Sequence, residues 1–202
     1  MLPKIKAMLR ILRYKYILLL IIAILPFSCR ERAVPKPRGY FRIDLPVKEY
    51  RTYDTICPFV FEYPVYGHIS YDVGKTTEPC WFNLEFPQFK AIIHFSYKSV
   101  NKNLGILLKE TYDYAYSHSI KADAITEQPW QNKESKVYGI LYDIKGNTAS
   151  SIQFFLTDST KNFIRGALYF YAEPRADSLA PVIKFFREDI LHLVETFKWK
   201  NK

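Results

Sequence analysis

The sequence lacks the short motifs that mark most catalytic and cofactor sites. It has no nucleophile elbow, P-loop, dinucleotide-binding fingerprint or zinc motif. The four histidines, His68, His94, His118 and His192, have no second histidine or cysteine at metal-ligand spacing. We therefore expect no enzymatic activity, no metal and no cofactor, and we interpret His94 and His192 as structural residues.

Internal repeats, low-complexity tracts and a second linker are also absent, which excludes a repeat array and indicates a single domain. Acidic residues are absent from the first 28 positions, where Lys4, Lys6, Arg10, Arg13 and Lys15 lie. The whole chain has a formal charge of +9, so without these five cations residues 29–202 carry only +4. So mild a charge is not the footprint of a nucleic-acid-binding protein, and we expect no nucleic-acid partner.

The N-terminus has the order of a bacterial lipoprotein signal. An unbroken apolar run over residues 17–25 follows the basic segment, and Pro26, Phe27 and Ser28 then lead to Cys29. A lipobox usually has leucine where Pro26 stands. We predict that residues 1–28 are a signal peptide and that Cys29 carries a lipid, with palmitate among its acyl chains, that binds the bilayer. The alternative is an uncleaved anchor helix, but the apolar run is shorter than the about 20 residues that a spanning helix needs.

Residues 29–39 are predicted to be a membrane tether, because they contain prolines and basic residues without apolar periodicity. Residues 40–202 are then one domain with a real core. Cys57 and Cys80 are the only other cysteines. In an oxidising compartment they predict a disulfide, which would stabilise the fold by roughly 3 kcal/mol. The alternative is two free buried thiols.

Hydrophobic periodicity predicts an α+β fold with a largely antiparallel sheet and a helix packed on each face. The element order is similar to that of the Mog1/PsbP-type α/β/α sandwich. Pro129, Trp130 and Asn132 are expected in a loop. The predicted strands are residues 57–63, 68–73, 81–86, 91–97, 136–144, 150–158 and 162–172. The predicted helices are residues 104–119, capped by Asn101 or Asn103, and residues 179–197, capped by Asp177 or Ser178.

Polar clusters interrupt these apolar stretches at the end of the first helix and at two strand connections. His118, Asp123 and Ser150 or Ser151 could be drawn as a hydrolytic triad, but a triad is defined by geometry and not by spacing. Short polar residues at helix ends and turns usually cap backbone groups. We therefore interpret the clusters as structural or as a possible partner surface, composed of His118, Lys121, Asp123, Asn147, Ser150, Ser151 and Asp158.

Aromatic residues make up 17% of the chain, with 16 Tyr and 15 Phe. Most such rings fill cores and sheets. A tyrosine-rich exposed face for a partner is the alternative.

Several motifs, in order along the mature chain, carry a resemblance to a known family. They are KPRGYFRI (36–43), CPF (57–59), CWFN (80–83), YKSVN (97–101), HSIKAD (118–123), ASSIQF (149–154), TDS (157–159), GALYFY (166–171) and ETFKW (195–199). Together they resemble the GldD-type gliding-motility lipoproteins of Bacteroidetes over essentially the whole mature chain. The resemblance implies an envelope lipoprotein required for surface gliding and associated with the type IX secretion machinery. It brings no established catalytic residues.

These observations favour a non-catalytic assembly or accessory component whose partners are other gliding and secretion proteins of the envelope. Surface-exported lipoproteins of this phylum often begin with an acidic run, and Arg30-Glu31-Arg32 is not one, so we expect the domain to face the periplasm. The alternative function is a periplasmic module that binds a peptide or small ligand. A deep apolar pocket with converging polar groups would favour this second function.

Overall fold

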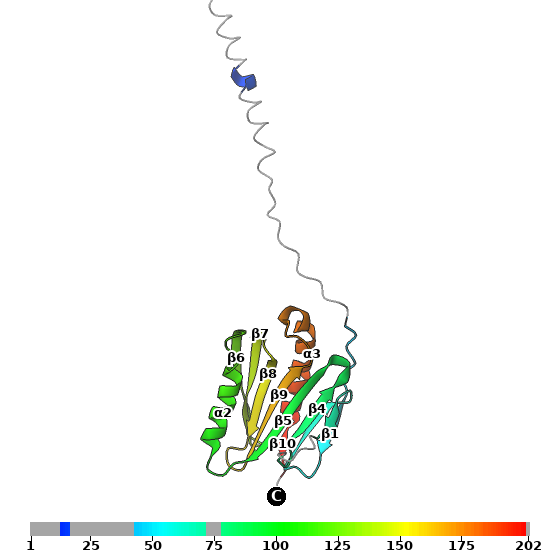
Figure 1. Cartoon of the computed structure of the whole chain (residues 1–202), viewed down its shortest axis with the longest axis vertical. Coiled ribbons are helices and arrows are strands. Elements are labelled where there is room, and N and C mark those ends of the chain that lie inside the picture. The colour runs from blue at the N-terminus through cyan, green and yellow to red at the C-terminus, as the bar shows by residue number, and fades with distance from the viewer. Residues whose placement is uncertain (1–12, 17–42, 72–77, 201–202) are drawn as a thin grey trace, which may run out of the picture. The chain divides into compact units, whose positions relative to one another are not determined.

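The computed structural model describes residues 13–16, 43–71 and 78–200 (Figure 1). The chain divides into two units, residues 1–41 and 42–202. Of the first unit only residues 13–16 are described, and they are helical; Cys29 and the tether lie outside the described residues. Within the described ranges, no helix combines the length and the apolar character that crossing a membrane requires.

Two antiparallel sheets form the second unit. The larger has seven strands in the order β3-β4-β5-β9-β8-β7-β6. Its strands are β3 (His68–Ser70), β4 (Phe82–Phe86), β5 (Ala91–Ser99), β6 (Ala122–Asn132), β7 (Val137–Gly146), β8 (Ser150–Thr157) and β9 (Asn162–Phe170). The smaller sheet, in the order β1-β2-β10, contains β1 (Tyr50–Asp54), β2 (Phe59–Pro64) and β10 (Lys198–Trp199).

Two helices cover opposite faces of the larger sheet (Figure 1). They are α2 (Leu104–Tyr116) and α3 (Ala176–Thr196), and a short 3-10 turn, η2 (Pro87–Phe89), joins β4 to β5. Side chains alternate between the faces of a strand, so Phe154 of β8 packs in the core beneath α3 while Phe155 packs in the core beneath α2. The predicted α+β fold, with one helix on each face, is confirmed.

The smaller sheet packs through an aromatic cluster on the same face as α3. The ring centroid of Phe61 in β2 lies 5.8 Å from that of Phe95 in β5 and 6.1 Å from that of Phe197 after α3. A disulfide between Cys57 and Cys80, with Cα atoms 5.7 Å apart, joins the segment before β2 to the segment before β4. The cysteine pairing predicted from the sequence is therefore present, and it links the two sheets.

Three strands were not predicted from the sequence. β1 and β10 are short pieces of the smaller sheet, and β6 includes Pro129 and Trp130, which we expected in a loop. Among the described strands, β6 pairs with β7 alone and lies at the edge of the sheet. An edge strand tolerates proline because one side of its backbone makes no ladder hydrogen bonds, which is why the loop prediction is wrong.

The N-cap position is as predicted for α2 and differs from the prediction for α3. Asn103 is the N-cap of α2, but its side chain makes no capping bond, and its Oδ1 instead accepts a hydrogen bond from the backbone N–H of Asn101. The N-cap of α3 is Arg175, not Asp177 or Ser178. Asn147, far away in sequence, accepts a hydrogen bond from the N–H of Ala176 at 2.8 Å. A helix start needs acceptors for its free N–H groups, and here the tertiary structure supplies one.

Candidate functional site

The predicted partner surface divides between the two ends of the larger sheet. His118 and Lys121 lie in the connection from α2 to β6, and Asp123 lies at the start of β6. This segment packs against the end of β7. At Gly146, whose φ is +111°, an added Cβ would lie 2.8 Å from both the Lys121 carbonyl oxygen and the Asp123 nitrogen. Asn147 follows directly, so these residues share one end of the sheet.

Other residues of the predicted partner surface are buried or already form hydrogen bonds within the fold. Ser150 has no exposed surface and Ser151 is 6% exposed. The Ser150 hydroxyl donates to the Ile152 carbonyl oxygen. Asn147 is exposed but is already engaged with the start of α3.

Asp158 lies at the opposite end of β8, in the turn to β9. Its Oδ1 accepts hydrogen bonds from the backbone N–H groups of Thr160, Lys161 and Asn162 at 2.7–2.9 Å. Burial raises the pKa of the Asp158 carboxyl, but these backbone donors outweigh burial and hold the pKa below its usual range. The carboxylate therefore stabilises the hairpin, as polar turn residues commonly do.

The residues drawn as a triad do not form a hydrogen-bonded chain in the described part of the molecule. The hydroxyl of Ser150 is turned to a backbone carbonyl, and no hydrogen bond links the side chains of His118 and Asp123. Burial, followed by the nearby Arg165 charge, lowers the pKa of His118. A nucleophile needs its base within hydrogen-bond reach, and this arrangement does not provide it.

His192 and His94 take part in side-chain contacts. The His192 Nε2 lies 2.7 Å from Glu62 Oε2, and its ring stacks on Tyr50 with centroids 3.6 Å apart, which joins α3 to the smaller sheet. His94 Nδ1 lies 2.7 Å from Asn83 Oδ1 across β4 and β5.

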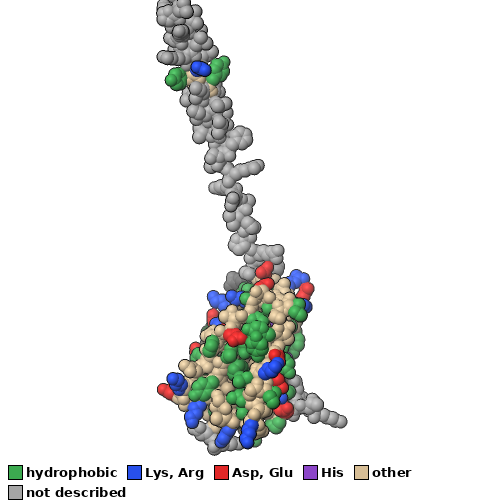
Figure 2. Space-filling view, turned by 90° about the vertical axis from the view of Figure 1, so that its left-hand side faces the viewer, with side chains coloured by type: hydrophobic (Ala, Val, Ile, Leu, Met, Phe, Trp, Pro, Cys, Tyr) green, Lys and Arg blue, Asp and Glu red, His purple; other side chains and the backbone are tan. Residues whose placement is uncertain are grey.

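Tyrosines are exposed on two sides of α2. Tyr112 lies with Tyr116 on one side, and Tyr114 lies on the other side, against Arg165 of the sheet. Tyr112 is 47% and Tyr114 is 53% exposed, and the rings of Tyr112 and Tyr116 stack with centroids 4.1 Å apart. Figure 2, which views the side of α2 and β6, shows apolar side chains gathered there. Tyrosine combines an apolar ring with a hydrogen-bonding hydroxyl and is enriched at protein interfaces.

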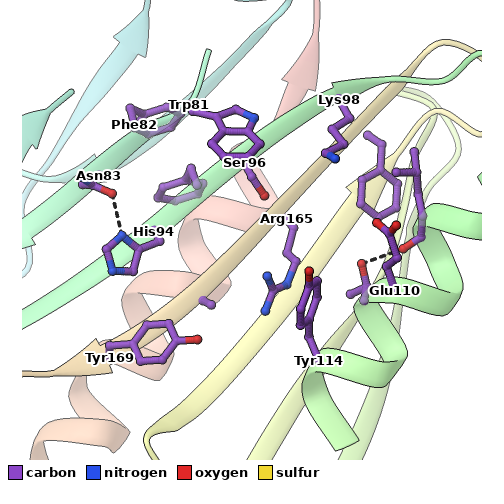
Figure 3. Close-up of a pocket in the computed structure, with 15 residues that line it drawn as sticks. Trp81, Phe82, Asn83, His94, Ser96, Lys98, Glu110, Tyr114, Arg165 and Tyr169 are labelled. Carbon is purple, nitrogen blue, oxygen red and sulfur yellow. Dashed lines mark hydrogen bonds between the residues drawn. The ribbon is translucent and has the colours of Figure 1, made fainter. Parts of the chain in front are cut away.

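A cavity of about 500 Å³ lies beside α2, on the part of the sheet that this helix leaves uncovered (Figure 3). Strands β4, β5 and β9 form its floor, and the side of α2 that faces the sheet forms one wall. The lining includes Trp81, Asn83, His94, Ser96, Lys98, Leu107, Glu110, Tyr114, Phe163, Arg165, Ala167 and Tyr169. Its volume lies within the range of small-ligand sites.

Arg165 lies at the centre of this cavity, between Tyr114 and Tyr169 (Figure 3). Its Nη2 donates to Gln153 Oε1 at 2.8 Å, and its Cζ lies 4.4 Å from the centre of the Tyr114 ring. Its Nε is buried and has no hydrogen-bond partner among the described residues. Burial lowers the pKa of the Arg165 guanidinium, and Tyr169 and Tyr114 offset this in part.

Arg165 and its neighbours were not predicted from the sequence as a site. The signal was present, because Arg165 is the only charged residue of the otherwise apolar β9 stretch. Only the strand pairing brings it beside Ser96 of β5, and only the packing of α2 places Tyr114 against it.

A second, more polar hollow of about 760 Å³ lies at the other end of the sheet. Its lining contains Asp158 and the lysines Lys136, Lys161, Lys198 and Lys200. Lys200 is engaged there, because its Nζ donates to the Thr55 carbonyl oxygen and pairs with Asp54. Within the described ranges, no group of His, Cys, Asp and Glu side chains could hold a metal ion.

Comparison with known proteins places the chain in a family. No curated protein matches it. Among solved structures it is similar to the PsbP protein (CyanoP) of the cyanobacterium Synechocystis, determined in solution, with 12% identity and a TM-score of 0.46 over 79% of this chain and 97% of that chain. The family model described as "Gliding motility lipoprotein GldD" matches residues 30–199. That match spans both sheets, both helices and the cavity, and the chain therefore belongs to the GldD family of gliding motility lipoproteins.

Proposed function

We propose that the protein is a lipid-anchored, non-catalytic component of the gliding motility and type IX secretion machinery. The family match over residues 30–199 carries this proposal, because it associates the chain with the cell envelope and with gliding. Cys29 directly precedes the matched residues and would hold the domain on the bilayer. The domain would face the periplasm and bind other envelope proteins of the machinery.

The exposed residues around the end of α2 are the proposed contact surface. His118 is half-buried, and Lys121, Asp123 and Asn147 are exposed at the end of the sheet where α2 ends. Tyr112 and Tyr116 of α2 extend this surface. An aromatic patch bordered by polar residues is the usual composition of a protein interface. This supports the proposal that the protein acts by binding its partners in a complex and not by catalysis.

The cavity beside α2 supports a second candidate function, a module that binds a peptide or small ligand. Aromatic and aliphatic side chains line it, and Arg165, Asn83 and Tyr169 converge on it. A cavity of this size on which polar groups converge is a candidate ligand site. The two functions are compatible, because the ligand could be part of a partner protein.

The anchor is tested by Cys29→Ala. We expect loss of labelled fatty-acid incorporation and release of the protein from the membrane fraction. The matched control is the double variant Cys57→Ala, Cys80→Ala, which keeps Cys29 and should remain labelled. Normal labelling of Cys29→Ala would show that the lipoprotein assignment is wrong.

The proposal that the protein acts by binding partners is tested with single alanine variants of His118 and Asp123, compared with the core variant Phe186→Ala. Truncation of the fully buried Phe186 should cost about 3–5 kcal/mol and lower protein abundance. The polar variants should reduce gliding or secretion only as far as they reduce abundance or partner co-purification. A polar variant that stays abundant and bound but loses all function would point to catalysis instead.

A further inference from the structure

We infer that the cavity beside α2 binds a carboxylate and that Arg165 is the residue that pairs with it. The ligand class is a carboxylate that carries an apolar or aromatic group, as the C-terminal residue of a peptide does. This inference rests on the second candidate function and specifies its ligand.

The first observation is a guanidinium without a counter-charge. Among the residues that the structure describes, no carboxylate forms an ion pair with Arg165, whose side chain is only partly exposed. A guanidinium cannot be deprotonated in a protein and has five N–H donors. Removing a charge from water without pairing it costs free energy. Binding of an anion to Arg165 would recover part of this free energy.

The second observation is that the surroundings fix the guanidinium before any ligand arrives. Gln153 is fully buried in β8, and its Oε1 accepts the hydrogen bond from Arg165 Nη2. The Tyr114 ring lies against the guanidinium carbon. Both contacts are with neutral groups, so they orient the guanidinium without neutralising its positive charge. Preorganised donors bind an anion at lower entropic cost.

The third observation is the charge and shape of the lining. Lys98 shares the cavity with Arg165, and Glu110 of α2 is the only acidic residue among the lining side chains. With Lys98 and Arg165 against Glu110, the lining carries one net positive charge, which suits a monoanion better than a doubly charged phosphate. Trp81, Leu107 and Phe163 supply apolar walls for the remainder of the ligand.

The experiment uses isothermal titration calorimetry on the full chain in detergent micelles. The probes are N-acetyl-alanyl-phenylalanine with a free carboxylate, the same peptide with a C-terminal amide, and 3-phenylpropanoate. We expect the free carboxylate peptide to bind at least about 10-fold more tightly than the amide, because charge-assisted bidentate pairs with arginine are strong. Comparison with 3-phenylpropanoate distinguishes a peptide terminus from a small free acid.

Three variants identify the pairing residue. Arg165→Gln should reduce the preference for the carboxylate to less than about 2-fold. Ala167→Leu keeps Arg165 but fills space at the cavity floor, so it should weaken both peptides. The matched control is Arg175→Gln, which removes an exposed arginine paired with Glu173 and should change neither affinity. Thermal unfolding of each variant checks that the domain is folded.

The outcomes separate this inference from the function on which it rests. Equal binding of carboxylate and amide peptides would overturn the inference and leave a ligand-binding module. No binding of any probe would overturn both. Inorganic phosphate that displaces the carboxylate peptide at equal concentration would overturn the assignment of a monoanionic carboxylate.

Discussion

At the scale of single residues, Asp189 shows how this fold keeps a buried charge. It lies on α3 and is 2% exposed. Its carboxylate accepts hydrogen bonds from Lys48 Nζ at 2.7 Å, Tyr66 at 2.6 Å and Tyr50 at 3.0 Å. Burial, followed by the Asp189 carboxylate, raises the pKa of both tyrosines, so both remain donors. The network joins the chain before β1 and the β2–β3 turn to α3.

We predict that Asp189→Asn lowers the free energy of unfolding by about 2–3 kcal/mol. The amide is neutral and offers one oxygen, so Lys48 loses its partly buried partner and one tyrosine loses its acceptor. The measurement is urea unfolding followed by circular dichroism. Glu188→Gln is the matched comparison: it removes the same charge from the exposed neighbour, whose Oε2 lies 3.8 Å from the same Lys48 Nζ, and it should cost about 0.5 kcal/mol or less. Equal stability of the two variants would contradict the network.

Arg165 differs from Asp189 because its charge has no ion-pair partner among the described residues. Asp189 has a cation and two hydroxyls around its charge, whereas Arg165 has one amide and aromatic rings around it. A fold selected for stability alone would be expected to pair or remove such a charge. This difference in charge pairing is the physical reason for proposing that Arg165 binds a ligand.

At the scale of elements, the approach of β9 to β8 depends on glycine. An added Cβ at Gly166 would lie 2.3 Å from the Phe154 ring, which is 1% exposed and packs in the core beneath α3. Such a ring cannot move aside freely in a core packed at native density. The glycine therefore allows a large aromatic residue to cross the neighbouring strand.

We predict that Gly166→Ala costs about 1–3 kcal/mol through overpacking. Gly105→Ala is its matched control, because Gly105 lies in α2 and nothing would come within 4 Å of the added Cβ. There the same substitution should stabilise by about 0.5–1 kcal/mol, since alanine favours helix and restricts the unfolded chain. Thermal unfolding of both variants gives the comparison. Changes of the same sign would contradict the assigned packing.

At the scale of the whole molecule, the disulfide between Cys57 and Cys80 links two sheets that share one core. It closes a segment with a sequence separation of 23. The cross-link restricts the unfolded chain more than the folded one.

We predict that reduction of this disulfide lowers the free energy of unfolding by about 3 kcal/mol. The measurement compares urea unfolding of the full chain with and without dithiothreitol. The control is the double variant Cys57→Ala, Cys80→Ala, on which dithiothreitol should have no effect. If the untreated protein reacts with a thiol reagent at both cysteines, they are free thiols and the disulfide is absent.

The sequence alone determined those properties that depend on local periodicity and composition. Hydrophobic periodicity predicted strands over residues 81–86 and 91–97 and a helix over residues 179–197, close to the observed β4, β5 and α3, because side-chain direction follows from the repeat of a strand or helix. Cys57 and Cys80 had only one possible pairing once Cys29 was set aside. The family motifs predicted the family that the model match over residues 30–199 shows.

Tertiary structure alone decided the rest. Pro129 belongs to a strand because β6 lies at an edge, and α3 begins at Ala176 because Asn147 reaches it from another turn. The cavity around Arg165 combines residues of β4, β5, β9 and α2. Strand order, edge position and which helix covers which part of a sheet are non-local properties. The lack of an ion pair at Arg165 among the described residues cannot be read from the sequence around it, because it depends on all the side chains packed there.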